Sequence, residues 1–290
     1  MKSYTTVLQT NLLVFLKTWK YAIVHNLSGN QHMKDKYREQ WERLGNKDPY
    51  WAVLTDPEKK GNKWSSEKFF QAGEAELSIA FLILKRLEIP ITYDLAVDFG
   101  CGVGRLTRAL SFRFDKVIGV DISSSMLNEA RRANKHIENI DFVHNTPDNL
   151  TIFADNSVDF LYCNIVLQHM PKRKQLVFIK EFCRILRPAG SLVFQTPSST
   201  NLRTFEGWIH LLAGNTIMNF ARRIKYGLNH VMEIHTLGGN EAKKILYQQG
   251  MDILHIRRHD SAGPALKSYM YFTRKGSVDP CLTSHKETEV

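Results

Sequence analysis

The chain has few cysteines and no long apolar run. None of its four cysteines (Cys101, Cys163, Cys183 and Cys281) stands at metal-ligand or disulfide-framework spacing, so we expect no metal site and a reducing, cytoplasmic compartment. No apolar stretch is long enough to span a bilayer, and the first residues lack the cleavage site of a signal peptide. Internal repeats and low-complexity tracts are also missing. These absences, with 43% hydrophobic and 23% charged residues, leave an ordinary globular enzyme as the expected class.

Acidic residues are outnumbered, with 29 against 39 basic ones, for a formal net charge of +10. The basic clusters at residues 172–174, 222–225 and 257–258 are scattered, which is typical of solvated faces. We therefore expect a small-molecule substrate and no nucleic acid partner. An RNA or protein acceptor is the alternative, and RNA would need these clusters to converge on one cleft. Nothing in the sequence indicates an obligate protein partner.

Residues 1–90 are predicted to form a helical N-terminal cap without strand periodicity. Near its start, apolar side chains share one helical face: Leu8, Leu12, Phe15, Leu16 and Trp19. This helix is expected to pack on the core or to cap a cofactor cleft, with contact to a membrane surface as the alternative. A second helix is expected from Ser65 or Ser66 to Leu87, with a break at Gly73. Its half from Leu77 to Leu84 is apolar nearly all round, which predicts burial against a sheet.

From Thr92 onward, apolar strands alternate with helices. The predicted strands are Leu95–Phe99, Val117–Asp121, Ile140–His144, Val158–Cys163, Ser191–Thr196, Ile253–Arg257 and Ser268–Thr273. The predicted helices are Leu106–Phe112, Ser124–Ala133, Lys172–Leu186 and one capped by Asn240. This alternation indicates an α/β fold: a Rossmann-like, doubly wound, seven-stranded and mostly parallel sheet. The last two strands are too close for a helical crossover, so they should form a C-terminal antiparallel hairpin.

The sequence therefore predicts that the chain is organised in three parts. The cap covers residues 1–90, the α/β domain covers 91–275, and a polar tail covers 276–290. Within the domain, the segment 197–237 is an insertion after the fifth strand, with helices expected near 202–212 and 216–226. Connections of this length in a compact domain usually form lids or substrate-binding pieces.

Three glycines spaced one apart follow the first strand: Gly100, Gly102 and Gly104. A strand that enters a glycine turn and then a helix leaves backbone N–H groups free to face a ligand. The spacing is Gly-x-Gly-x-Gly, whereas pyrophosphate-binding turns use Gly-x-Gly-x-x-Gly. Asp98 stands just before the glycines, where it would repel a phosphate. Asp121 ends the next strand, where a carboxylate can accept hydrogen bonds from both ribose hydroxyls.

The region from Leu95 to Arg274 resembles the class I S-adenosylmethionine-dependent methyltransferases, in particular the type 11-like group. The resemblance rests on the glycine loop, on Val117–Ser123 with its strand-ending acid, on Ser157–Cys163 and on Arg184–Gly190. It implies S-adenosylmethionine as cofactor. Asp159, two residues into the fourth strand, is expected to tether backbone and is left out of the site.

The resemblance also implies roles for individual residues. Cofactor contacts are expected from Asp98, Gly100, Cys101, Gly102, Gly104, Asp121, Ile122, Asn145, Thr146 and Asn164. The family often has an acid after the third strand, and here Thr146 replaces it or Asp148 has taken its place. The stretch Trp51–Glu76 looks like helices that close over the cofactor in some members, with Phe70 and Gly73 near its methionine end.

Methyl transfer from a sulfonium is an in-line displacement that depends mainly on alignment and on exclusion of water. An O–H or N–H nucleophile can need a general base, for which His169 after the fourth strand is the candidate; His230, His235 and Asp260 are further candidates. The expected acceptor is a small molecule that is anionic, aromatic or lipid-like. A nicotinamide-dependent oxidoreductase and a cofactor-binding module without turnover are the alternative functions.

Overall fold

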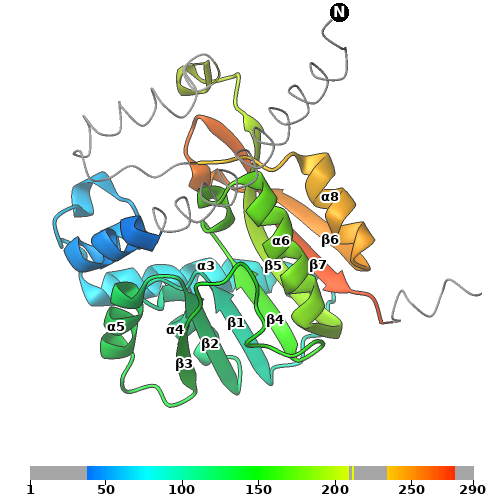
Figure 1. Ribbon diagram of the computed structural model, residues 1–290, viewed down its shortest axis with the longest axis horizontal. Coiled ribbons are helices and arrows are strands. Elements are labelled where there is room, and N and C mark those ends of the chain that lie inside the picture. The colour runs from blue at the N-terminus through cyan, green and yellow to red at the C-terminus, as the bar shows by residue number, and fades with distance from the viewer. Residues whose placement is uncertain (1–37, 209–210, 212–233, 278–290) are drawn as a thin grey trace, which may run out of the picture.

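The computed structural model describes residues 38–208, 211 and 234–277, and its centre is one seven-stranded sheet (Figure 1). The strand order is β3-β2-β1-β4-β5-β7-β6. The strands are β1 (Leu95–Phe99), β2 (Lys116–Asp121), β3 (Ile140–His144), β4 (Val158–Cys163), β5 (Leu186–Thr200), β6 (Met251–Arg258) and β7 (Leu266–Lys275). This confirms the Rossmann-like fold that the alternating pattern predicts.

The carboxyl ends of the central strands meet at one edge of the sheet. β1 pairs in parallel with β2 on one side and β4 on the other, with Val97 level with Ile118 and Leu161. The chain therefore reverses its direction of winding between β1 and β4, which makes their carboxyl ends a topological switch point. β7 runs antiparallel to both β5 and β6, as the short connection between the last two strands predicts.

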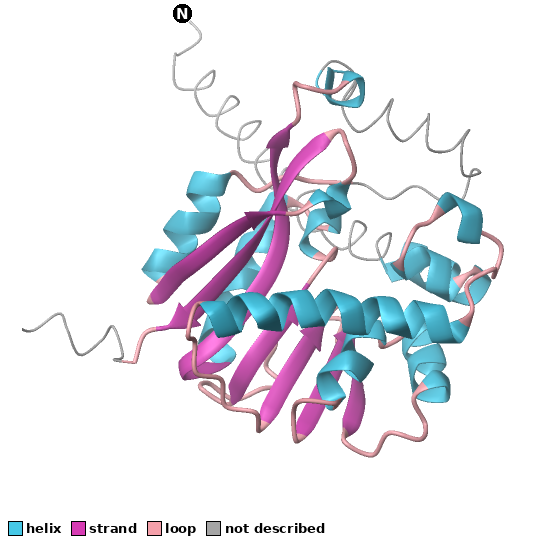
Figure 2. Cartoon of the chain, turned by 180° about the vertical axis from the view of Figure 1, so that it is seen from behind, coloured by secondary structure: helices cyan, strands magenta, loops and turns pink. Residues whose placement is uncertain are grey.

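Helices cover both faces of the sheet (Figures 1 and 2). The long helix α3 (Ser66–Arg86) and α4 (Arg105–Ser111) share a buried apolar cluster with one face, including Leu77, Leu110 and Phe160. The helices α6 (Lys172–Ile185) and α8 (Gly239–Gln248) cover the other face, where Phe182 and Leu246 are fully buried. Helix α5 (Ser124–Ala133) has the predicted bounds and packs beside β2 and β3.

The predicted break in α3 at Gly73 is wrong, because the helix continues through this residue. A Cβ at Gly73 would lie 2.6 Å from the carbonyl oxygen of Arg105. The glycine therefore permits close packing of α3 on the start of α4. The predicted burial of the half from Leu77 to Leu84 against the sheet is confirmed, because Leu77 and Leu84 pack in one cluster with Phe160 of β4. Ile79 and Leu82, on the opposite side of the helix, are about half exposed.

Several element ends differ from the prediction. β5 extends from Leu186 to Thr200, well past the predicted 191–196, because its far end pairs with β7 as far as Leu266. Helix α6 ends at Ile185, and α8 is preceded by Gly238 as its N-cap, so Asn240 lies inside the helix.

The described part of the N-terminal cap is helical and packs over the glycine loop. It contains a helix at 38–47, then α2 (Pro49–Val53) and a short 3-10 turn, Pro57–Lys59. Glu42 caps α5: its carboxylate accepts hydrogen bonds from the backbone N–H groups of Ser124 (2.6 Å) and Ser125 (2.9 Å). Burial raises the pKa of Glu42, but the hydrogen bond from the Ser124 hydroxyl (2.7 Å), together with those from Ser125 and the Ser124 backbone, lowers it to about 2. The predicted helix at the start of the chain, the helix near 216–226 and the tail from residue 278 onward lie outside the described residues.

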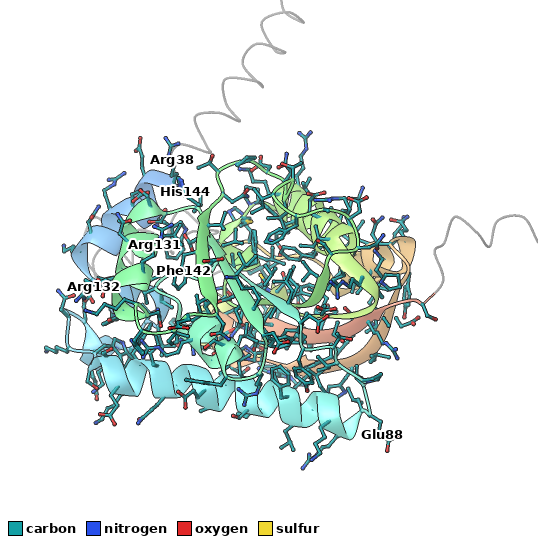
Figure 3. All side chains as sticks on the ribbon, turned by 90° about the horizontal axis from the view of Figure 1, so that it is seen from below. Arg38, Glu88, Arg131, Arg132, Phe142 and His144 are labelled. Carbon is teal, nitrogen blue, oxygen red and sulfur yellow. The ribbon has the colours of Figure 1, made fainter. Side chains whose placement is uncertain are left out.

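The outer edge of the sheet is tied to α5 and to the loop after β2 (Figure 3). Arg131 donates a hydrogen bond to the carbonyl of Phe142, and His144 Nε2 donates to the carbonyl of Ile122 at 2.8 Å. The first bond ties α5 to β3, and the second fixes the position of Ile122, which follows the strand-ending acid. Within the described ranges, we find no helix with the length and hydropathy needed to cross a membrane.

Candidate active site

A cavity of about 910 Å³ lies at the carboxyl ends of β1, β2 and β4. Ten of the eleven residues expected as cofactor contacts or as the first base candidate line it: Asp98, Gly100, Cys101, Gly102, Asp121, Ile122, Asn145, Thr146, Asn164 and His169. The volume is near the upper end of the range for ligand pockets. The cavity therefore has space for more than one small molecule.

The first two glycines of the loop are required by close contacts at positive φ. Gly100 has φ 75°, and a Cβ there would overlap the side chain of Val166 after β4. Gly102 has φ 53°, and its Cβ would lie 2.5 Å from Cγ2 of Val53 in α2. The loop is therefore enclosed by the segment after β4 and by the N-terminal cap.

Gly104 is not part of the cavity lining. It is the N-cap of α4 with φ 79°, and a Cβ there would lie 2.8 Å from the ring of Phe142. Its position explains why glycine is needed at the turn. The cofactor contact that the resemblance implies for it has no support from this geometry.

Asp121 is held rigidly at the end of β2. Its Oδ2 accepts a hydrogen bond from the Gly102 N–H at 2.8 Å, and its Oδ1 accepts one from the Ser123 N–H at 2.8 Å. Burial raises the pKa of Asp121, while these two N–H groups act in the opposite direction. The carboxylate thus ties the glycine loop to the second strand and faces the cavity.

Asp98 is almost fully buried, with 1% of its surface exposed. Its Oδ2 accepts a hydrogen bond from Thr107 Oγ1 at 2.7 Å. Burial raises its pKa to about 7, with the Thr107 bond and the charge of Arg105 lowering it less. Near neutral pH, Asp98 therefore exchanges its proton readily and can respond to a positive charge brought into the cavity.

Glu76 on α3 is a cavity residue that the sequence analysis did not select. Its Oε2 lies 2.7 Å from Arg105 Nη2 in an ion pair. Its Oε1 accepts hydrogen bonds from Asn164 Nδ2 at 2.7 Å and from Tyr162 OH at 3.1 Å. A glutamate inside an amphipathic helix gives no sequence signal of its own. Only the packing of α3 across the sheet brings it below the glycine loop.

Two buried polar atoms at this end of the cavity have no hydrogen-bond partner: Arg105 Nε and Asn164 Oδ1. Their residues are 3% and 7% exposed, and both line the cavity. A buried donor or acceptor without a partner costs roughly 1–3 kcal/mol. A ligand with an anionic group and an ammonium group would satisfy both atoms.

The opposite end of the cavity is formed by the loop after β3. Asn145 donates from Nδ2 to the carbonyls of Pro147 and Asn149, so its amide shapes this loop. Thr146 and Asp148 both line the cavity, and Asp148 is paired with Lys174 at 3.0 Å. The sequence left open whether Thr146 or Asp148 stands in for the acid that the family often has after the third strand. Both residues lie in the cavity wall, and the charge of Asp148 is neutralised by Lys174.

His169 lies in the wall beside the N-terminal cap and is 8% exposed. Its ring meets that of Trp41 edge to face, with 5.3 Å between centroids. Its Nε2 lies 3.3 Å from Gln168 Nε2. Because packing and this amide hold the ring, His169 has a defined structural environment, and its catalytic role remains a prediction.

The loop after β4 is held by a buried glutamine. Ile165 has φ 62°, a rare conformation for a β-branched residue. Gln195 on β5 is fully buried, and its Oε1 accepts a hydrogen bond from the Ile165 N–H at 3.1 Å. Its Nε2 donates to Gln168 and to Ser268. This network holds Asn164 and Val166 against the cavity.

The connection between β6 and β7 forms another wall of the same cavity. The residues of the connection that line it are 259–265. Asp260, a candidate from the sequence, lies here, but its carboxylate pairs with Arg258 at 3.0 Å. His235 does not line the cavity, and His230 lies outside the described residues. His259, which the sequence analysis missed, does line it.

Other expectations about contacts have mixed outcomes. Asp159 tethers backbone as predicted: it accepts from the Leu95 N–H at 2.9 Å and pairs with Arg187 at 2.8 Å. Phe70 and Gly73 do not line the cavity, whereas Trp51 does.

Cys101 lines the cavity, and burial raises the pKa of its thiol well above the ordinary value. Among the described residues, no group of His, Cys, Asp or Glu could hold a metal ion.

Comparison with known proteins finds a methyltransferase domain and partial similarity to curated proteins. Residues 97–194 match the family described as "Methyltransferase domain". The bifunctional biotin biosynthesis protein BioHC of Cellvibrio japonicus is 26% identical over 238 residues, which are 80% of this chain and 43% of that protein. The demethylmenaquinone methyltransferase of Staphylococcus haemolyticus is 35% identical over 114 residues, 38% of this chain and 46% of that enzyme. The chain thus spans less than half the length of these curated relatives.

A solved structure extends the likeness to the whole fold. The magnesium protoporphyrin IX methyltransferase of Synechocystis PCC 6803, crystallised with bound S-adenosylhomocysteine, superposes with a TM-score of 0.56. The match covers 84% of this chain and 99% of that one, at 18% identity. The sheet order and this superposition show that the chain has a Rossmann-like methyltransferase fold, and residues 97–194 within it match the methyltransferase domain family.

Proposed function

We propose that the protein is an S-adenosylmethionine-dependent methyltransferase that moves a methyl group to an oxygen or nitrogen nucleophile of a small molecule. The observation that carries this proposal is the charge of the cavity. Although the whole chain has a net charge of +10, the cavity lining contains six carboxylates and two cations. The carboxylates are Glu76, Asp98, Asp121, Asp148, Glu206 and Asp260, and the cations are Arg105 and Lys174.

Both cations are already paired within the lining, Arg105 with Glu76 and Lys174 with Asp148. Of the remaining carboxyl groups, Asp260 pairs with Arg258 outside the lining. The other three, Asp98, Asp121 and Glu206, favour a ligand with a net positive charge and oppose one with two phosphates. S-adenosylmethionine has a sulfonium, an ammonium and a single carboxylate. A nicotinamide dinucleotide has a pyrophosphate, so the same charges argue against the oxidoreductase alternative.

The unpartnered atoms described above fit the amino-acid end of this cofactor. In our proposal, Arg105 Nε donates to its carboxylate. Asn164 Oδ1 and the adjacent Glu76 carboxylate accept from its ammonium, and Asp121 accepts from the ribose hydroxyls. Ile122 packs on the adenine, with Asn145 and Thr146 at the adenine edge.

When bound, the cofactor supplies an electrophilic methyl group on sulfur. The chain contributes binding, alignment and exclusion of water, which account for much of the rate in displacements of this kind. Val53 and Trp51 from the cap and Val166 after β4 close over the glycine loop. The acceptor enters beside Trp41 and the β6–β7 connection, since the remainder of the cavity lies there.

Calorimetric titration of the full chain with S-adenosylmethionine, S-adenosylhomocysteine and NAD tests the proposal. We expect saturable binding of both sulfur nucleosides and none of NAD. Transfer of labelled methyl from the cofactor to a small-molecule extract, followed by mass spectrometry, then identifies the acceptor. Tight binding of NAD alone would overturn the proposal, and binding without any labelled product would favour a module without turnover.

Substitution Asp121→Ala tests the ribose contact. We expect the dissociation constant for S-adenosylhomocysteine to rise by roughly 10- to 100-fold, which corresponds to the roughly 1.5–3 kcal/mol of a charge-assisted hydrogen bond. Asp141→Ala is the control, since this exposed carboxylate on β3 pairs only with Lys116 at the surface. Unchanged affinity in Asp121→Ala would remove this residue from the binding site.

A further inference from the structure

The β6–β7 connection places a histidine against the cavity at a point that no sequence motif marks. His259 directly follows β6, and its backbone N–H donates to the carbonyl of Ser268 on β7 at 2.9 Å. This bond fixes the backbone at the start of the connection. The half-buried side chain lines the same cavity as Asp98 and Asn164.

One ring nitrogen of His259 is occupied by a neighbour and the other is not. Nδ1 lies 2.7 Å from Ser261 Oγ. No described residue forms a hydrogen bond with Nε2. When Nδ1 carries the proton and donates it to Ser261, the lone pair of Nε2 is free to accept a proton from a ligand.

The charges around His259 leave it neutral near pH 7. Burial lowers its pKa below the ordinary 6.5, and the charge of Arg257 on β6 acts in the same direction. The carboxylates of Glu76 on α3 and Asp260 in the connection oppose this shift. The influence of Glu76 also means that His259 lies within electrostatic reach of the residues assigned to the amino-acid end of the cofactor.

The walls near His259 are mainly apolar. Ile234 packs against Ala262, Ala265 and Leu266, and Pro264 and Met170 complete this side of the cavity. The charged lining residues here are Glu206 and Asp260, of which Asp260 pairs with Arg258. Of the three acceptor classes left open by the sequence, an anionic molecule is the least compatible with this lining.

From this geometry we propose that His259 is the catalytic base, and that the acceptor is a neutral, largely apolar molecule with one reactive O–H or N–H group. The proposal rests on the methyltransferase function proposed above. As the acceptor heteroatom bonds to the methyl carbon, the carbon–sulfur bond breaks and its electron pair stays on sulfur. The acceptor proton moves to Nε2 of His259, and the resulting imidazolium later releases it to water.

The first test needs no acceptor. Long-range ¹H–¹⁵N spectra of the full chain with labelled histidine report which ring nitrogen carries the proton, and His259→Gln identifies the signal by its loss. At pH 7.5 we expect a neutral ring protonated on Nδ1. A ring protonated on Nε2, or an imidazolium at this pH, would overturn the proposal.

The second test uses the labelled small-molecule extract and saturating methyl donor. We expect His259→Gln to lower methyl transfer by about 100-fold or more, the usual contribution of a general base, with unchanged binding of S-adenosylhomocysteine. His255→Gln is the matched control, because this exposed histidine on β6 lies outside the cavity lining. Wild-type transfer in His259→Gln, or equal losses in both variants, contradicts the proposal.

The pH profile separates a base from a structural residue. In the wild type, transfer should fall as the pH drops below the pKa of His259, because the protonated ring cannot accept a proton. This acid limb should be absent in His259→Gln. If it persists there and disappears in His169→Gln, His169 is the base. Failure of the wild type to bind S-adenosylhomocysteine would instead refute the proposed function on which this inference depends.

Discussion

Replacement of Asp98 by asparagine is expected to stabilise the protein without ligand while it weakens cofactor binding. The folded protein holds the proton of Asp98 up to about pH 7, whereas the unfolded chain releases it near pH 3.8. Ionisation of this carboxyl therefore lowers the free energy of unfolding. The loss increases as the pH rises from about 4 to 7 and is constant above pH 7. A shift of about three pKa units corresponds to about 4 kcal/mol.

The measurement is urea unfolding of the wild type and Asp98→Asn at pH 5 and pH 8. The gain in unfolding free energy should be several kcal/mol at pH 8 and smaller at pH 5. Asp159→Asn is the matched control: this buried strand carboxylate is paired with Arg187, so its loss should destabilise the protein. A destabilising effect of Asp98→Asn at pH 8 would mean that its carboxylate is not penalised by burial.

The ionised carboxyl of Asp98, which lowers the free energy of unfolding, should strengthen cofactor binding. A cationic ligand favours the ionised form of Asp98, so the affinity for S-adenosylmethionine should rise between pH 6 and pH 8 with release of a proton. Asp98→Asn should remove this pH dependence. Calorimetry in buffers of different ionisation enthalpy detects the released proton, and its absence in the wild type would exclude Asp98 from the electrostatics of binding.

Replacement of Glu76 by alanine has the second large expected effect. Its carboxylate is the ion-pair partner of Arg105, whose side chain is only 4% exposed, and it also accepts from Tyr162 and Asn164. Removal of one partner of a buried ion pair leaves an uncompensated charge and costs roughly 3 kcal/mol or more. We therefore expect a comparable loss of unfolding free energy, and weaker binding of S-adenosylmethionine.

Two further variants separate stability from binding. In Glu76→Ala combined with Arg105→Met, the buried charge is gone, so stability should recover in part while cofactor affinity stays low. Glu74→Ala on the same helix is the control, since Glu74 does not line the cavity. Full recovery of affinity in the double variant would show that neither residue contacts the cofactor.

Much of the parallel core follows from local patterns. The strands at 95–99, 140–144 and 158–163 and the helix at 124–133 have the predicted bounds, because each is a short apolar or amphipathic run between clear turn or capping residues. The ends of β5 and β7 were predicted too short, because their pairing with each other, as at Thr200 and Leu266, extends them. Sequence periodicity does not contain that pairing.

The glycine at position 73 illustrates a different limit. Local propensity predicts that glycine interrupts a helix, yet α3 continues because the missing side chain allows contact with the backbone of Arg105. The glycine turn and the family resemblance predict a ligand contact at Gly104, where the structure has a turn packed on Phe142. A glycine signals a close approach, but only the fold decides whether the neighbour is a ligand or the protein itself.

The sequence by itself determined the glycine loop, the acids Asp98 and Asp121 at the ends of the first two strands, and the order of strands and helices, because these depend on residues that are neighbours in the chain. The tertiary structure alone decided which side chains complete the cavity. Glu76 comes from a helix packed across the sheet and His259 from the connection of the last two strands, more than 180 residues apart in the chain. Their meeting depends on packing and strand pairing over that separation, and no local pattern encodes such a distance.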